Sequence, residues 1–156
     1  MGKDKFYLNR AIEIASNGIN DGGGPFGAVI VKDNKIISEA CNRVVLNNDP
    51  TAHAEILAIR QAASVLQSHD LKDCTLYTTC EPCPMCLGAI YWAGIKKIFY
   101  SCDRTDAEDA GFSDKLIYNE ILLDPTKRKI SFVQMTGLGG EEVFGKWNDL
   151  ENKVAY

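Results

Sequence analysis

The sequence predicts an α/β protein in three layers (α-β-α), with helices covering both faces of a five-stranded mixed sheet. Helical and strand-like segments alternate along the 156 residues, and two adjacent strand-like segments are joined by a short turn. The alternation is typical of helices that flank a sheet, and the turn predicts an antiparallel hairpin at one edge. The composition is that of a globular protein, 46% hydrophobic and 24% charged, and the length suits a single domain covering residues 1–156.

The first half of the chain begins with apolar residues at helical spacing, and this pattern ends at Gly22-Gly23-Gly24-Pro25. Two β-rich segments follow, and Asp33-Asn34 between them predicts the hairpin turn. A polar loop then leads to a second amphipathic helix, whose apolar face includes Ile56 and Ile59. In chain order, we expect a helix, two strands and a helix at residues 5–20, 26–31, 35–41 and about 52–67.

The second half of the chain is expected to alternate strand and helix three times. The predicted elements lie at residues 74–78, 84–93, 97–101, 113–122, 130–135 and 141–152. The segment 130–135 is the fifth strand of the predicted sheet. In sheets of this kind a ligand binds where strands end and helices begin.

The charge and the ends of the chain exclude some classes of protein. A net charge of −4 and an isoelectric point near 5.2 argue against a large nucleic-acid-binding surface, which needs a basic face. No apolar segment is long enough to cross a membrane, and no apolar signal core follows the N-terminus. We therefore expect a cytoplasmic protein whose six cysteines are reduced or bound to a metal.

Two short segments carry the chemistry: H-x-E at residues 53–55 and P-C-x-x-C at residues 82–86. His53, Cys83 and Cys86 can bind Zn²⁺ and leave a fourth position open for water. In favourable sites Zn²⁺ lowers the pKa of bound water from about 15.7 to about 7. Glu55 is the acid or base that such a water needs, so the pattern indicates a catalytic zinc site.

The spacing of these residues also predicts local structure. Cys83 and Cys86 lie at the start of a predicted helix, where free backbone N–H groups favour thiolates. His53 and Glu55 are two residues apart, which in mid-helix directs side chains to nearly opposite sides. They can converge only at the exposed first turn, so we expect the helix to begin here, capped by Asp49 or Thr51.

The cysteines allow other interpretations. A redox Cys-x-x-Cys pair explains neither His53 nor Glu55. Cys80, Cys83 and Cys86 also have the spacing of part of an iron–sulfur site, but the sequence offers no obvious fourth ligand. A structural zinc with Cys80 as its fourth ligand would leave Glu55 without a role. A non-catalytic zinc module would likewise have no need for Glu55.

Four motifs carry a resemblance that extends over almost the whole chain. They lie at residues 24–28 (GPFGA), 48–55 (NDPTAHAE), 80–86 (CEPCPMC) and 88–93 (GAIYWA). On these motifs the chain resembles the cytidine and deoxycytidylate deaminase superfamily, which implies a cytidine deaminase-like fold. Thr105-Asp106-Ala107, the AGFSD motif at 110–114 and Tyr156 make it most similar to the bacterial guanine deaminase branch.

The resemblance implies hydrolysis of guanine to xanthine and ammonia, with one zinc ion per subunit. It implies that His53, Cys83 and Cys86 bind the zinc, that Glu55 moves protons, and that Asp114 faces the substrate and assists proton transfer. Further residues are implied to contact the base: Phe26, Asn42, Ala54, Trp92 and Tyr156. The resemblance also implies a homodimer that exchanges a C-terminal segment, about residues 137–156, so that each tail closes the partner's site.

Judged from the residues alone, several of these positions have a plainer interpretation. Phe26, Trp92 and Asn42 are also compatible with the core or a turn, and Asp114 with a helix cap. Related activities are alternatives as well: tRNA adenosine-to-inosine deamination, or deamination of guanosine, cytosine or an aminotriazine. The tRNA activity needs Lys and Arg contacts to phosphates, and the low isoelectric point and the absence of a basic tail disfavour it.

Overall fold

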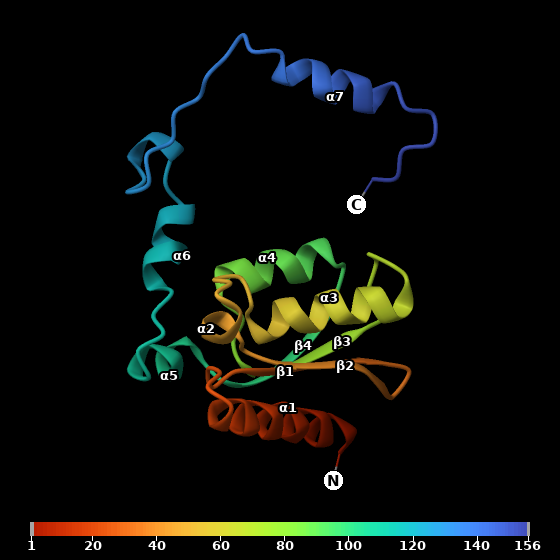
Figure 1. Ribbon diagram of the computed structural model, residues 1–156, viewed down its shortest axis with the longest axis vertical. Helices are drawn as coiled ribbons and strands as arrows, with labels where there is room; N and C mark the ends of the chain where they lie inside the picture. The colour runs from red at the N-terminus through yellow and green to blue at the C-terminus, as the bar shows by residue number, and fades with distance from the viewer. Residues whose placement is uncertain (1, 156) are drawn as a thin grey trace. The chain divides into compact units, whose positions relative to one another are not determined.

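The computed structural model describes residues 2–155 and divides the chain into two compact units. One extends from the N-terminus to Asp114 and the other from Lys115 to the C-terminus (Figure 1). The unit that ends at Asp114 contains the sheet and every motif around the expected zinc site. A single domain over residues 1–156 with an exchanged tail stays a prediction.

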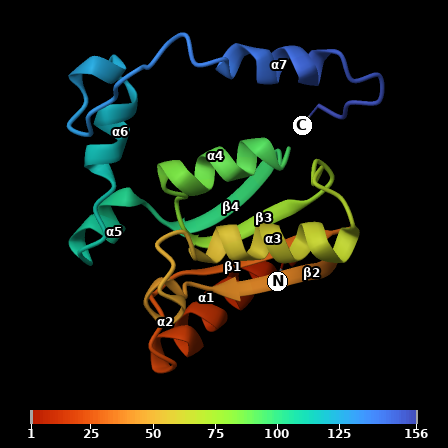
Figure 2. The same ribbon diagram turned by 45° about the horizontal axis from the view of Figure 1, so that its top comes forward.

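The N-terminal unit contains a four-stranded mixed sheet in the order β2-β1-β3-β4. β1 pairs antiparallel with β2 and with β3, whereas β3 and β4 are parallel. The hairpin of β1 and β2 therefore lies at one edge, as predicted, and the curved sheet is visible in Figure 2. The strands are β1 (Gly27–Lys32), β2 (Lys35–Cys41), β3 (Thr75–Cys80) and β4 (Lys97–Cys102).

The expectation of a fifth strand at residues 130–135 is wrong, because this segment has no regular secondary structure. It lies in the C-terminal unit, where the regular elements of the described residues are helical and none is a strand. A strand is stabilised by hydrogen bonds to a neighbouring strand, and its own unit offers this segment none. Alternating apolar residues were therefore insufficient to predict a strand here.

The hairpin turn forms at the two residues that the sequence indicated. Asp33 and Asn34 adopt positive φ angles of 50° and 61°, between the paired residues Lys32 and Lys35. Two consecutive left-handed residues give the turn type whose twist matches that of antiparallel strands. Asn and Asp tolerate this conformation better than other residues with side chains, which explains why this dipeptide predicts the turn.

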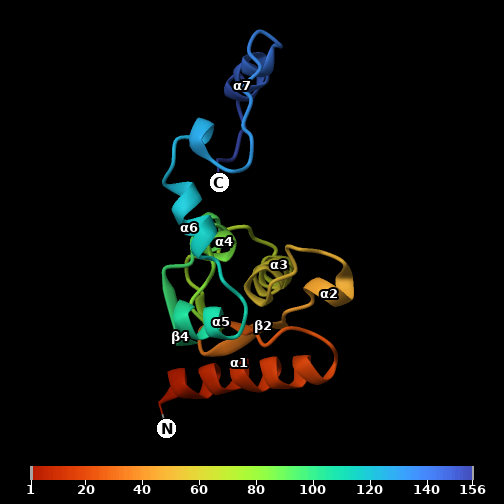
Figure 3. The same ribbon diagram turned by 90° about the vertical axis from the view of Figure 1, so that its left-hand side faces the viewer.

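Helices cover both faces of the sheet, which confirms the layered α/β prediction. α1 (Lys3–Asn20) lies on one face, and α3 (Ala54–Leu66) and α4 (Pro84–Trp92) lie on the other, as Figure 3 shows edge-on. The apolar core accordingly has two parts. Ile30 and Leu76 pack on the side of α3 and α4, whereas Val29 and Tyr77 pack on the side of α1.

α1 lies so close to β1 that only a glycine fits at the contact. A Cβ atom on Gly27 would collide with the backbone carbonyl oxygen of Ala11. An ion pair holds the same helix to the hairpin, because the guanidinium of Arg10 donates two hydrogen bonds of 2.8 Å to Glu39. These bonds lower the pKa of Glu39.

The remaining elements are short. α2 (Val44–Asn47) precedes α3, and α5 (Arg104–Asp109) follows β4. The acidic run of residues 103–109 thus forms α5 together with its N-cap residue. A capping box between Asp103 and Asp106 stabilises the N-terminus of this helix. The C-terminal unit contains α6 (Lys115–Ile121), a 3-10 turn (Pro125–Lys127) and α7 (Gly140–Asn148). Among the described residues, no helix is both long and apolar enough to cross a membrane.

Candidate metal centre and active site

The three predicted metal ligands lie at the first residues of two helices. His53 is the N-cap residue of α3, and Cys83 is the N-cap residue of α4. Cys86 lies within the first turn of α4, after Pro84 at the start of that helix. Pro fits there because its missing N–H would have no partner within the helix. The end of β3 delivers the chain to α4, so the site forms where a strand ends and a helix begins.

The ligand atoms have the spacing of a tetrahedral zinc site. Nδ1 of His53 lies 3.6 Å from Sγ of Cys83 and 3.6 Å from Sγ of Cys86. All three ligand atoms lie within 4.8 Å of one another. Zinc bonds of about 2.0 Å to nitrogen and about 2.3 Å to sulfur, at a tetrahedral angle, would separate the two donors by about 3.6 Å. The residues therefore fit Zn²⁺.

Of the two cysteine ligands, Cys83 has the charge state that suits a cation, whereas the hydrogen bond to Cys83 and burial raise the pKa of Cys86. The hydrogen bond donated by the Cys86 thiol, together with His53, lowers the pKa of Cys83 to about 4. Cys83 is therefore a thiolate at neutral pH, as zinc binding requires. Cys80 differs, since its thiol donates to the carbonyl oxygen of Asp103 and burial raises its pKa to about 11. Among the described residues the metal cluster has three protein ligands and excludes Cys80.

Glu55 lies beside the ligands and is only 5% exposed. Its Oε2 lies 3.5 Å from Sγ of Cys86, and its Oε1 accepts a hydrogen bond of 3.2 Å from the hydroxyl of Thr78. Burial, aided by the negative charge of Cys83, raises the pKa of Glu55 above its ordinary value. A raised pKa makes the carboxylate a better proton acceptor, and a general base and acid must take up a proton and return it.

These residues fall within a recognised family region. Residues 1–102 match the family described as the cytidine and deoxycytidylate deaminase zinc-binding region. The matched segment includes His53, Glu55, Cys83 and Cys86 and covers well over half of the chain. This chain is a member of the cytidine and deoxycytidylate deaminase family. Its metal cofactor is therefore zinc.

The deaminase resembles two kinds of characterised relative. It is 54% identical over 151 residues to a guanine deaminase of Bacillus subtilis (strain 168), which covers 96% of this chain and 97% of the relative. The X-ray structure of guanine deaminase from Bacillus subtilis matches with a TM-score of 0.94 and 53% identity, covering 97% of this chain and 98% of that one. A tRNA-specific adenosine deaminase of Buchnera aphidicola subsp. Schizaphis graminum is 36% identical over 128 residues, 82% of this chain and 83% of that protein.

The start of α3 differs in one detail from the sequence prediction. Neither Asp49 nor Thr51 caps the helix; Asp49 instead accepts hydrogen bonds of 2.8 and 2.7 Å from the backbone N–H and the hydroxyl of Thr51. Two residues separate this turn from Ala54, and His53 occupies the N-cap position. The expectation that His53 and Glu55 converge at the first turn of α3 is correct. The hydrogen bonds between Asp49 and Thr51 order the loop that precedes this helix.

Asp114, the last residue of the N-terminal unit, lies close enough to the cluster to respond to its charge. Partial burial and the negative charge of Cys83 both raise the pKa of Asp114. Two residues earlier, Phe112 packs edge-on against Phe26, with ring centroids 5.0 Å apart. The loop that carries Asp114 is thus held against the chain just before β1.

The other predicted substrate residues differ in how deeply they are buried. Asn42 is buried, and its Oδ1 accepts a 3.3 Å hydrogen bond from the backbone N–H of Val44. Ala54 is fully buried at the first position of α3. Trp92 ends α4, six residues beyond Cys86, and is 69% exposed. Tyr156 lies outside the described residues. The roles of all four in binding the base stay predictions.

Sequence reasoning missed two contacts that shape the site. Thr78 was assigned only to a strand, although a hydroxyl on a strand that is expected to be buried is a sign of a buried polar contact. The edge-on contact between Phe112 and Phe26 was also missed, although both residues stand in quoted motifs. No pattern in the sequence pairs these two rings, because the contact depends on the fold that brings residues 26 and 112 together.

Proposed function

We propose that this deaminase hydrolyses guanine to xanthine and ammonia. The observation that carries the proposal is 54% identity to a guanine deaminase over 96% of this chain, combined with a three-ligand metal site beside a buried carboxylate. A shared zinc motif alone does not identify the substrate, because tRNA adenosine deaminases also match this chain. Here the likeness extends beyond that motif, over nearly the full length of both chains.

The residues divide the chemistry between them. When bound, zinc lowers the pKa of a water molecule in the position that His53, Cys83 and Cys86 leave open. Glu55 would accept the first proton from the attacking water and deliver it to a ring nitrogen, and would then take the second proton from the new hydroxyl group and deliver it to the amine, which leaves as ammonia as the carbonyl group forms. The buried position of Glu55 keeps bulk water from competing for these protons, which suits a group that must carry two of them in turn.

We assign substrate recognition to groups around the metal centre. Guanine presents an N1–H and a 2-amino group, both donors, and the carboxyl group of Asp114 can accept from them. Asn42 has its Oδ1 engaged by Val44, so its amide nitrogen is the group we expect to donate to the base. Phe26 and Trp92 would supply flat apolar walls for the purine ring. Ala54 would approach the base at the start of α3, and Tyr156 would close the site.

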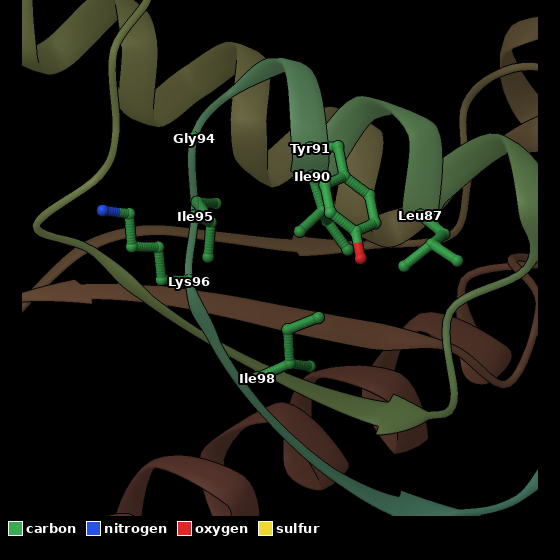
Figure 4. Close-up of a pocket in the computed structure, with 7 residues that line it drawn as sticks. All are labelled: Leu87, Ile90, Tyr91, Gly94, Ile95, Lys96 and Ile98. Atoms are coloured by element: carbon green, nitrogen blue, oxygen red, sulfur yellow. The ribbon is translucent and has the colours of Figure 1, made fainter.

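We further propose a homodimer that exchanges a C-terminal segment of about residues 137–156, in a cytoplasmic setting. None of the described residues after Asp114 is buried, although many of them are apolar. Such residues need a covering surface. The N-terminal unit contains an apolar hollow of about 490 Å³ where Tyr91 and Leu87 of α4 lie above Ile98 of β4 (Figure 4). A second copy of the chain is the partner we propose.

Deleting residues 152–156 is expected to lower kcat/KM for guanine by roughly tenfold or more while leaving the melting temperature nearly unchanged. Loss of a closing segment admits water and loosens the substrate, whereas the core of the N-terminal unit does not involve these residues. Co-expression with Glu55→Gln provides the test of exchange. If the tail closes the partner's site, the mixed dimer regains activity that neither variant has alone. Normal activity of the truncated protein contradicts the proposal.

The substrate itself is tested by ammonia release from the zinc-loaded protein. We expect guanine to be the best substrate among guanine, guanosine, cytosine, adenine and a tRNA anticodon stem-loop. The net charge of −4 makes the stem-loop a poor substrate, because binding a polyanion depends on cationic side chains. Faster release from the stem-loop or from cytosine than from guanine would replace the proposal with one of its alternatives.

A further inference from the structure

The carboxylate of Glu55 has a polar neighbour at each of its oxygens. Oε1 accepts a 3.2 Å hydrogen bond from the hydroxyl of Thr78, and Oε2 lies 3.5 Å from Sγ of Cys86. One oxygen therefore points to the sheet and the other to the metal ligands. A carboxylate that moves protons at a reacting centre must keep a fixed orientation, because misplacement by about 1 Å costs on the order of 10²-fold in rate.

Thr78 is placed for this contact by the alternation of side chains along β3. Leu76, two residues earlier, packs in the core cluster on the side of α3 and α4, and Thr78 shares that face. Thr78 is 1% exposed, so water cannot replace its hydroxyl. Glu55 is the second residue of α3, so this one bond joins the middle of the sheet to the first turn of the helix.

We propose that Thr78 is a positioning residue for catalysis, which fixes the carboxylate of Glu55 so that Oε2 faces the metal ligands. This inference rests on the proposed guanine hydrolysis, in which Glu55 carries the protons. The hydroxyl of Thr78 donates its hydrogen bond to Glu55, so the role assigned to Thr78 acts through that carboxylate. Its loss should therefore slow turnover without weakening substrate binding.

The chain offers a matched control for loss of a buried hydroxyl. Ser38 on β2 is 6% exposed and donates a 2.8 Å hydrogen bond to the carbonyl oxygen of Ala58. It therefore also joins the sheet to α3, one turn beyond Glu55, but it has no contact with the carboxylate. Ser38→Ala measures what loosening the contact between sheet and helix costs by itself.

The test compares Thr78→Val, Thr78→Ser and Ser38→Ala, each loaded with zinc. We expect Thr78→Val to lower kcat for guanine by roughly 10- to 100-fold, with KM within about threefold of wild type. Thr78→Ser keeps the hydroxyl and should retain kcat within about threefold, as should Ser38→Ala. A kcat for Thr78→Val within threefold of wild type overturns the proposal, as does an equal loss in Ser38→Ala.

A crystal structure of Thr78→Val provides a readout that does not depend on activity. We expect the carboxylate of Glu55 to leave its single orientation, either rotating or occupying two positions, while His53, Cys83 and Cys86 stay in place. An unmoved carboxylate contradicts the positioning role. If wild type fails to release ammonia from guanine, the proposed function fails, whereas this structural comparison still decides the role of Thr78.

Discussion

Glu55→Gln is expected to bind zinc as wild type does and to lose guanine hydrolysis by roughly 10²- to 10⁴-fold, the range for general acid–base groups. The amide keeps the shape of the side chain and can still accept the hydrogen bond from Thr78. It cannot take a proton from the attacking water or return it to the leaving amine. Zinc content by elemental analysis and kcat from ammonia release measure the two effects separately.

The effect of Glu55→Gln on stability is expected to have the opposite sign from its effect on activity. Burial raises the pKa of Glu55, so the charged form is disfavoured in the folded protein and a neutral amide removes that penalty. The melting temperature of the zinc-free variant should therefore equal or exceed that of wild type. Retention of more than a tenth of the wild-type kcat would refute the role of Glu55 as the proton carrier.

Asp114→Ala is expected to reduce kcat/KM for guanine by roughly 10²-fold, with zinc content unchanged, because the base would lose a charged acceptor inside the site. Asp114 is not among the metal ligands, although it lies near enough to feel the charge of Cys83. Steady-state kinetics together with metal analysis measure the two quantities.

Asp109→Ala is the matched control for Asp114→Ala. Asp109 is an exposed acid at the end of α5, so the substitution removes the same charge five residues away. We expect its kcat/KM to stay close to that of wild type. If Asp114→Ala and Asp109→Ala have the same kcat/KM for guanine, then Asp114 does not accept a hydrogen bond from the base.

Most of the fold was predictable because its elements carry strong local signals. The expected helix at residues 5–20 is α1 (Lys3–Asn20), and the expected helix at 84–93 is α4 (Pro84–Trp92). Apolar spacing and Asp33-Asn34 are local properties, and local rules predict their outcome. The segment 130–135 shows the limit of such rules, since a strand depends on a partner that the segment itself does not encode.

The metal ligands were predictable for a related reason: H-x-E and P-C-x-x-C each place their residues within one turn at the start of a helix. The environment of Glu55 was not predictable in this way. Its hydrogen bond to Thr78 joins residues 23 positions apart, and the contact of Phe26 with Phe112 joins residues still further apart. Such pairs follow from the packing of α3 on the sheet and from the path of the loop after α5.

The two ligands at helix starts place a limit on engineering this protein for heat resistance. Ser, Thr, Asp or Asn at an N-cap position commonly contributes about 1 kcal/mol, and these substitutions are a routine way to raise thermal stability. Such a substitution is not available at residues 53 and 83, because the N-cap residues of α3 and α4 are metal ligands. Neither helix therefore has a side-chain cap. A designer would have to stabilise these helices at their C-terminal ends or along their buried faces.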